Sequence, residues 1–189
     1  MMVNEQVWLT ERDPLRLLEY LHFGGDKPRK QVLFSIACCR LMWESLDQCT
    51  REGVLAVEQS EAMDWSAAGD RDLFDRDLQW REIGSLWLKT FLVQGSTPNP
   101  VYYSRVCEII RDVFGNPFRQ VVIEPACVTP AIHDLASSIY ERNEFHRLPL
   151  LAEDLAIAGC KSTELLSHCR DGCFHVRGCW AMDQILGKH

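Results

Sequence analysis

The side chains best suited to chemistry in this chain lie close together near its C-terminal end. Residues 160–179 contain six possible metal ligands, namely Cys160, His168, Cys169, Cys173, His175 and Cys179. Zinc prefers four such ligands in a tetrahedron, typically cysteine thiolates and histidine nitrogens. His168 and Cys169 are neighbours on an expected helix and point about 100° apart, so only one of them joins a given site easily. The predicted zinc ligands are therefore Cys160, His168, His175 and Cys179.

The same spacing leaves two other interpretations open. It has none of the paired C-x2-C turns typical of zinc ribbons, and free cysteine packs as a small hydrophobic residue, so Cys160 and Cys179 could simply fill the core. The second alternative is a thiol nucleophile, Cys169 or Cys173, with His175 as its base. The sequence contains no phosphate-binding loop, no glycine-rich dinucleotide turn and no H-E-x-x-H motif.

The connection between the last two expected helices, 170–176, needs something to hold it in place. Both helices are short, the first beginning at Ser162 or Thr163, and short helices are marginal by themselves. Either Phe174, Val176 and Trp180 dock the connection onto the other helices, or a metal ion clips it to them. Because the ligand spacing matches no standard zinc module, docking is the preferred interpretation.

Composition and charge argue against several classes of protein. The 189 residues carry a formal net charge of −7 and no extended basic cluster, so no nucleic acid is expected as a partner. No run approaches the roughly 18 to 20 apolar residues of a membrane span, and no signal peptide precedes the first acidic residues. A cytoplasmic protein without membrane contact is therefore expected. Its nine cysteines are an odd number and are expected to be reduced thiols there.

Apolar residues recur at helical spacing along most of the chain, and alternating strand patterns are scarce. In the helix expected over 28–48, the apolar stripe consists of Val32, Ile36, Cys39, Trp43 and Leu46. Further helices are expected near 51–65, 71–93 and 101–114. Asp13-Pro14 and Thr129-Pro130 each predict a helix start by a cap followed by proline, another helix is expected from Pro149 to Gly159, and the last one near 177–187. The pattern predicts an all-α, orthogonal multi-helix bundle of about eight helices. We expect a single domain over 1–189, with a possible subdomain hinge near 94–100, where glycine and two prolines interrupt the helices.

Several strings of the chain resemble a known set of sequences. They are Ala37-Cys-Cys-Arg-Leu41, Arg111-Asp-Val-Phe-Gly-Asn-Pro-Phe-Arg119, His168-Cys-Arg170 and His175-Val-Arg-Gly-Cys-Trp180, together with the stretches around 138–149 and 151–160. They are similar to an uncharacterised paralogous family of bacterial proteins found in planctomycete-type genomes. The matching strings cover most of 28–50 and 107–188. The resemblance implies a stable helical fold in a bacterial cytosol and carries no activity, cofactor or site residue.

Two classes of function follow from these observations. The first is a non-enzymatic intracellular module that binds another protein or regulates it, and it is preferred because no catalytic constellation is evident. The alternative is an enzyme that uses a metal ion or an activated thiol of the C-terminal Cys/His cluster. A closed set of four protein ligands would favour the first class, and an open coordination position would favour the second.

Overall fold

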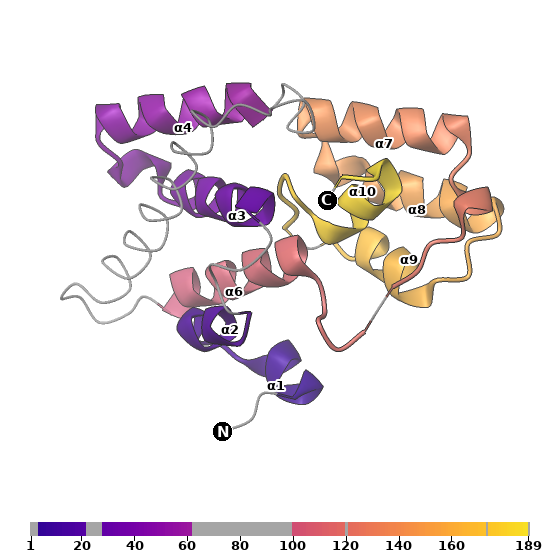
Figure 1. Cartoon of the computed structure of the whole chain (residues 1–189), viewed down its shortest axis with the longest axis horizontal. Helices are drawn as coiled ribbons and strands as arrows, with labels where there is room; N and C mark the ends of the chain where they lie inside the picture. Colours follow the sequence, from indigo (N-terminus) through magenta and orange to yellow (C-terminus); the bar gives the residue numbers. More distant parts are fainter. Residues whose placement is uncertain (1–3, 22–27, 62–99, 120, 173, 189) are drawn as a thin grey trace. The chain divides into compact units, whose positions relative to one another are not determined.

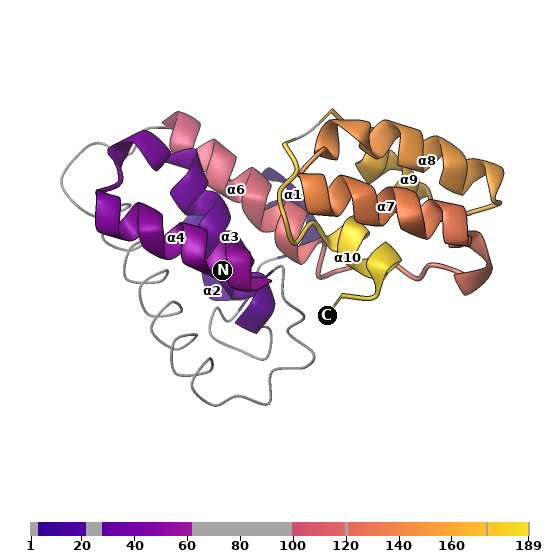
Figure 2. The ribbon, with the colours of Figure 1, turned by 90° about the horizontal axis from the view of Figure 1, so that it is seen from above.

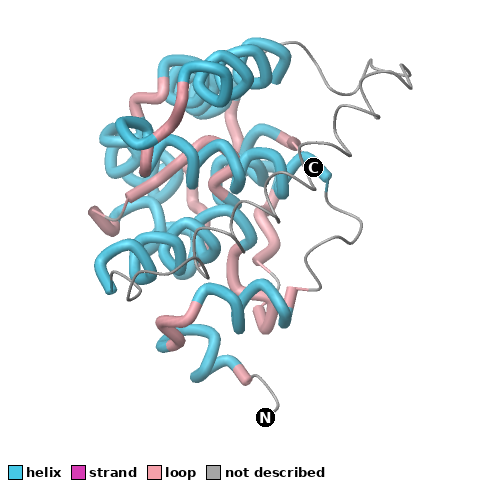
Figure 3. Tube along the Cα trace, turned by 90° about the vertical axis from the view of Figure 1, so that its left-hand side faces the viewer, coloured by secondary structure: helices cyan, strands magenta, loops and turns pink. Residues whose placement is uncertain are grey.

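A computed structural model describes residues 4–21, 28–61, 100–119, 121–172 and 174–188. These residues form nine α-helices joined by loops and short 3-10 turns, and no strand occurs among them (Figure 3). The prediction of an all-α protein of about eight helices is therefore confirmed. The chain divides into two compact units, Met1–Glu11 with Glu108–His189, and Arg12–Cys107. The expected single domain and orthogonal arrangement concern the whole chain and stay predictions.

The unit Arg12–Cys107 contains α2 (Pro14–Tyr20), α3 (Pro28–Leu41), α4 (Gln48–Glu61) and the start of α6 (Pro100–Phe114). The side chain of Asp13 caps α2, as the Asp-Pro pair predicts, by accepting a hydrogen bond from the backbone N–H of Leu15 at 3.0 Å. A small core joins α3 to α4, and its buried members are Val32, Ile36, Cys39, Leu46 and Val54. The helix expected over 71–93 and the hinge expected at 94–99 lie outside the described residues.

The continuous helix expected over 28–48 is wrong. It ends at Leu41, a 3-10 turn follows at Trp43–Ser45, and α4 begins at Gln48. The side chain of Asp47 accepts a hydrogen bond from the backbone N–H of Thr50 at 2.8 Å, which starts a new helix there. Leu46 still packs in the predicted core, so the apolar stripe is right although the helix that should carry it has ended.

The other unit contains α1 (Glu5–Thr10), the end of α6, α7 (Pro130–Arg142), α8 (Leu148–Ile157), α9 (Thr163–Arg170) and α10 (Trp180–Leu186). Helices α7 to α10 pack on one another around a common core, as Figures 1 and 2 show. Thr129 and Ser162 cap α7 and α9 with their hydroxyls, as their positions predict. The last helix begins at Trp180 rather than near 177, because the chain turns through Val176–Cys179 first.

Helix α1 is absent from the expected helices, because its six residues are too few for a clear apolar period. Asn4 caps it by accepting a hydrogen bond from the backbone N–H of Val7 at 2.9 Å, and Trp8 is its buried anchor. No helix among the described residues is both long and apolar enough to span a membrane.

Candidate metal centre

Three segments of the unit Met1–Glu11 with Glu108–His189 bring together four side chains that could hold a metal ion. Asp112 belongs to the last turn of α6, where Ile109, Ile110 and Val113 are fully buried around it. His168 lies in the last turn of α9. His175 belongs to the connection after α9, and Cys179 is the residue that precedes α10. The core that α7 to α10 share therefore positions three of the four side chains, and α6 supplies the fourth.

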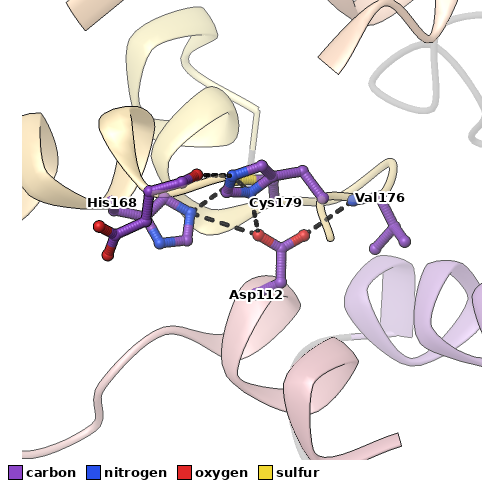
Figure 4. A network of polar contacts seen from close by, with 6 residues as sticks. Asp112, His168, Val176 and Cys179 are labelled. Atoms are coloured by element: carbon purple, nitrogen blue, oxygen red, sulfur yellow. Dashed lines mark hydrogen bonds and ion pairs between the residues drawn. The ribbon is translucent and has the colours of Figure 1, made fainter. Parts of the chain in front are cut away.

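The four side chains converge on one point (Figure 4). One ligand atom from each of Asp112, His168, His175 and Cys179 lies within 4.8 Å of the other three. Nε2 of His168 is 3.1 Å from Sγ of Cys179 and 3.3 Å from Oδ1 of Asp112. Nδ1 of His175 is 2.7 Å from Oδ1 of Asp112 and 3.9 Å from Sγ of Cys179. Zinc bonds of about 2.0–2.3 Å place the donor atoms of a tetrahedron about 3.3–3.8 Å apart, which these distances bracket.

The groups around the four side chains orient them as metal ligands are oriented. Nε2 of His175 lies 3.4 Å from the carbonyl oxygen of Asp171, and Nδ1 lies 2.7 Å from Oδ1 of Asp112, so each ring nitrogen faces an oxygen that can accept its proton. A bound metal ion would take the place of the proton on Nδ1, while Nε2 kept its N–H toward Asp171. A ligating histidine commonly donates its other N–H to a carbonyl in this way. The second carboxylate oxygen of Asp112 accepts a hydrogen bond from the backbone N–H of Val176 at 2.9 Å, which leaves Oδ1 facing the histidines.

The group is buried and its charges are strongly coupled. The side chains of Asp112 and His175 are 4 % exposed, that of His168 is 19 % exposed, and Cys179 is fully buried. Burial raises the pKa of Asp112, but hydrogen bonds from both histidines outweigh it and hold that pKa below its usual value. Burial opposes the charged form of His175, but its hydrogen bond and charge interaction with Asp112 raise the pKa overall. Burial and the charge of Asp112 raise the pKa of Cys179 well above that of a free thiol.

Three of the four predicted zinc ligands lie in this group, and the fourth lies elsewhere in the core. His168, His175 and Cys179 belong to the group and Cys160 does not; the fourth member of the group is Asp112. Gly159 ends α8 in the left-handed conformation, and the backbone N–H of Cys160 bonds back to the carbonyl of Leu155 at 2.9 Å. This helix-ending turn places Cys160 in the core, close to Cys127. Burial raises the pKa of Cys127, and the neighbouring thiol of Cys160 raises it further. Cys160 is thus placed as the core-filling alternative describes.

Among the described residues, the buried thiols of Cys169, Cys38 and Cys39 offer little to nucleophilic chemistry. Burial first, and then the charges of Asp112 and Cys160, raise the pKa of Cys169 to about 12, and the residue is fully buried. A reactive thiol needs a lowered pKa and access to solvent. Cys173 lies outside the described residues. Cys38 and Cys39 are buried in α3, as core packing predicts, and burial raises the pKa of Cys39 to about 11.

The three residues expected to dock the connection differ in their burial. Phe174 is the most exposed of the three, at 46 %. Val176 is half-buried and fastens its backbone to Asp112. Trp180 packs at the edge of the core, with its ring centroid 4.8 Å from that of His168. Docking by the side chain of Trp180 and the convergence of the four polar groups thus occur at the same junction.

Gly115 makes this junction possible, and a substitution there tests it. Its φ of +70° is left-handed, and a Cβ at this position would lie 3.1 Å from Cγ of Trp180. Gly115→Ala should cost about 1–2 kcal/mol for the backbone conformation alone, and more because Trp180 must move. Gly187→Ala is the matched control, since Gly187 has a φ of +65° and no atom near its Cβ position. Urea unfolding should show the larger loss for Gly115→Ala; equal losses would contradict a tight contact with Trp180.

No protein-family model, no curated protein and no solved structure matches the chain.

Proposed function

We propose that this chain is a zinc-binding helical protein in which one zinc ion fastens the C-terminal connection to α6 and α9. The observation that carries the proposal is the convergence of four donor atoms, from segments far apart in the sequence, within 4.8 Å of one another. Their mutual distances, from 2.7 to 3.9 Å where hydrogen bonds or ion pairs are formed, suit a small tetrahedral ion. The proposed ligands are Asp112, His168, His175 and Cys179.

The donor set selects a zinc-like ion over the abundant hard cations. Calcium and magnesium take six or more oxygen ligands, and this group offers one carboxylate. Two imidazole nitrogens and a thiolate are donors that zinc and related transition metals prefer. The carboxylate of Asp112 and the thiolate of Cys179 together balance the two positive charges of the ion. Balanced charge matters here, because an unpaired charge is costly at a buried site.

The geometry favours a stabilising role over catalysis. Four protein donors complete a tetrahedral shell and leave no position for water or substrate, as in structural zinc sites. Cys179 is fully buried and Asp112 nearly so, which keeps solvent from the centre. The metal-dependent enzyme is therefore the weaker of the two classes of function. Binding of another protein by the zinc-stabilised fold stays a proposal without an observation of its own.

Metal analysis with two matched cysteine variants tests the proposal. Protein prepared without a metal-affinity step and dialysed should retain one zinc per chain. Cys179→Ala and Asp112→Asn should lose it, whereas Cys160→Ala should keep it, because Cys160 lies outside the group although it too is buried. Cobalt in place of zinc should give the thiolate charge-transfer band and the strong visible bands of a tetrahedral site in wild type and Cys160→Ala. The absence of bound metal in the wild type, or its loss in Cys160→Ala alone, would refute this ligand set.

A further inference from the structure

The end of α6 contacts two distant parts of the chain through neighbouring residues. Arg111 donates from Nε to the carbonyl of Trp8 at 2.8 Å and from Nη2 to the carbonyl of Glu11 at 2.6 Å. These carbonyls lie in the last turn of α1 and just beyond it, where helix carbonyls lack partners within the helix. The next residue, Asp112, points to the C-terminal segment and holds His175 and Val176. Adjacent residues in one turn of α6 therefore bind α1 on one side and the connection before α10 on the other.

The residues that follow α6 also contact both α1 and the C-terminal segment. Gly115 lies against Trp180, which follows the ligand Cys179 directly. Its neighbour Asn116 donates from Nδ2 to the carboxylate of Glu5 in α1 at 2.9 Å. Arg119 forms an ion pair with the same carboxylate, and both interactions lower the pKa of Glu5. The segment 111–119 is thus a shared support for α1 and for the proposed metal centre.

We propose that docking of α1 and binding of zinc are thermodynamically linked through segment 111–119, so that the N-terminal helix regulates the metal affinity of the site. The inference rests on the proposed zinc site. Asp112 can reach its position as a ligand only while the last turn of α6 is formed, and the last turns of helices fray. Arg111, bonded to α1, holds this turn in the helical conformation. Zinc then binds to a turn that is already ordered and loses less conformational entropy on binding.

The linkage must act in both directions. Helix α1 has six residues, too few for a stable isolated helix, so its structure depends on its contacts with segment 111–119 and on burial of Trp8. If α1 strengthens zinc binding by some factor, zinc strengthens docking of α1 by the same factor. A metal ion bound near the C-terminus would therefore protect the N-terminal helix from opening.

Zinc affinity of the full chain, measured by competition with a chromophoric chelator, tests the first direction. Arg111→Gln removes the guanidinium that holds α1 and changes no ligand, and it should weaken zinc binding by about tenfold, within the usual range of coupling between sites. Arg147→Gln is the matched control, because Arg147, in the same unit, forms its hydrogen bond and ion pair with Glu144. The control should bind zinc as tightly as the wild type.

Hydrogen exchange of the wild-type protein tests the second direction without any substitution. Removing zinc with a chelator should speed exchange of the α1 amides of Trp8 and Glu11 by a similar factor. The amide of Ala158 at the end of α8, which opens by local fraying and lies on a helix that supplies no ligand, should change much less. The linkage would be wrong if Arg111→Gln bound zinc as tightly as the wild type, or if hydrogen exchange in α1 had the same rate with and without zinc. Either result would leave the proposed zinc site intact. If Arg111→Gln does not fold, the exchange result decides. A wild-type protein that binds no zinc would refute the site and the linkage together.

Discussion

Saturating the wild-type protein with zinc is expected to raise its free energy of unfolding by about 4 kcal/mol when free zinc is 1,000 times its Kd. The gain arises because Asp112, His168, His175 and Cys179 converge only in the folded chain, so the ion binds the folded state far better than the unfolded one. Urea unfolding at fixed free zinc, compared with unfolding in excess chelator, measures it. The increment should grow with the logarithm of free zinc, and a free energy of unfolding independent of zinc would contradict the proposed site.

Two substitutions separate the metal from the docking of Trp180. His175→Ala should lower stability in zinc and remove the effect of chelator, because a ligand and the partner of Asp112 are lost together. Trp180→Ala should destabilise the protein with and without chelator, since its ring packs against the core in either state. A half-buried side chain should cost less than the roughly 3–5 kcal/mol of a fully buried aromatic. If chelator destabilised neither the wild type nor Trp180→Ala, docking alone would hold the junction.

Three of the four proposed ligands could be predicted from the sequence because they lie within twelve residues of one another. Histidine and cysteine are the side chains that zinc prefers, and His168, His175 and Cys179 recur at short spacing. Which of the neighbouring cysteines joins them depends on how each helix ends. The left-handed Gly159 directs Cys160 into the core beside Cys127, and the spacing of ligands along the chain contains no information on that turn.

Asp112 could not be predicted as a member of this group, because it lies far upstream in α6 and meets the histidines only through tertiary packing. A trace of its role is nevertheless present in the sequence. Asp112 is flanked by Ile109, Ile110 and Val113, an apolar stripe that predicts a buried helix face. A carboxylate inside such a stripe needs a buried partner of opposite charge. This observation could have identified Asp112 as a candidate functional residue, though not which residues it meets.

The helices themselves were more predictable where the capping chemistry is local. Thr129 before Pro130 and Ser162 before Thr163 mark two helix starts by side chains that accept backbone N–H groups three residues on. The break between α3 and α4 was missed because the apolar period continues through it, and only the cap at Asp47 reveals the new start. Periodicity thus identified the buried side chains there, while the boundary depended on one hydrogen bond.

Between pH 6 and 8, the stability of the zinc-free protein should fall while the affinity for zinc should rise. In the zinc-free protein, the pKa of His175 is raised above its ordinary value of 6.5, because Asp112 outweighs the effect of burial. Its contribution to stability is therefore complete below about pH 6.5 and is lost as the pH rises through the higher folded value. Asp112 has a lowered pKa, so its contribution persists above its ordinary value of 3.8 and does not change between pH 6 and 8. The zinc-free protein should lose stability over that range.

Zinc binding should instead strengthen steeply over the same range. The ion requires a thiolate at Cys179, whose pKa burial and Asp112 raise well above 9.0, so each zinc bound near neutral pH displaces one proton from sulfur. Below the raised pKa of His175 it displaces a second proton from Nδ1. Zinc affinity should therefore rise about 10- to 100-fold per pH unit between pH 6 and 8. Competition titrations at pH 6, 7 and 8 measure this slope, with urea unfolding in chelator beside them. A zinc affinity that did not change with pH would show that Cys179 is not a ligand, because its thiol would then keep its proton when zinc binds.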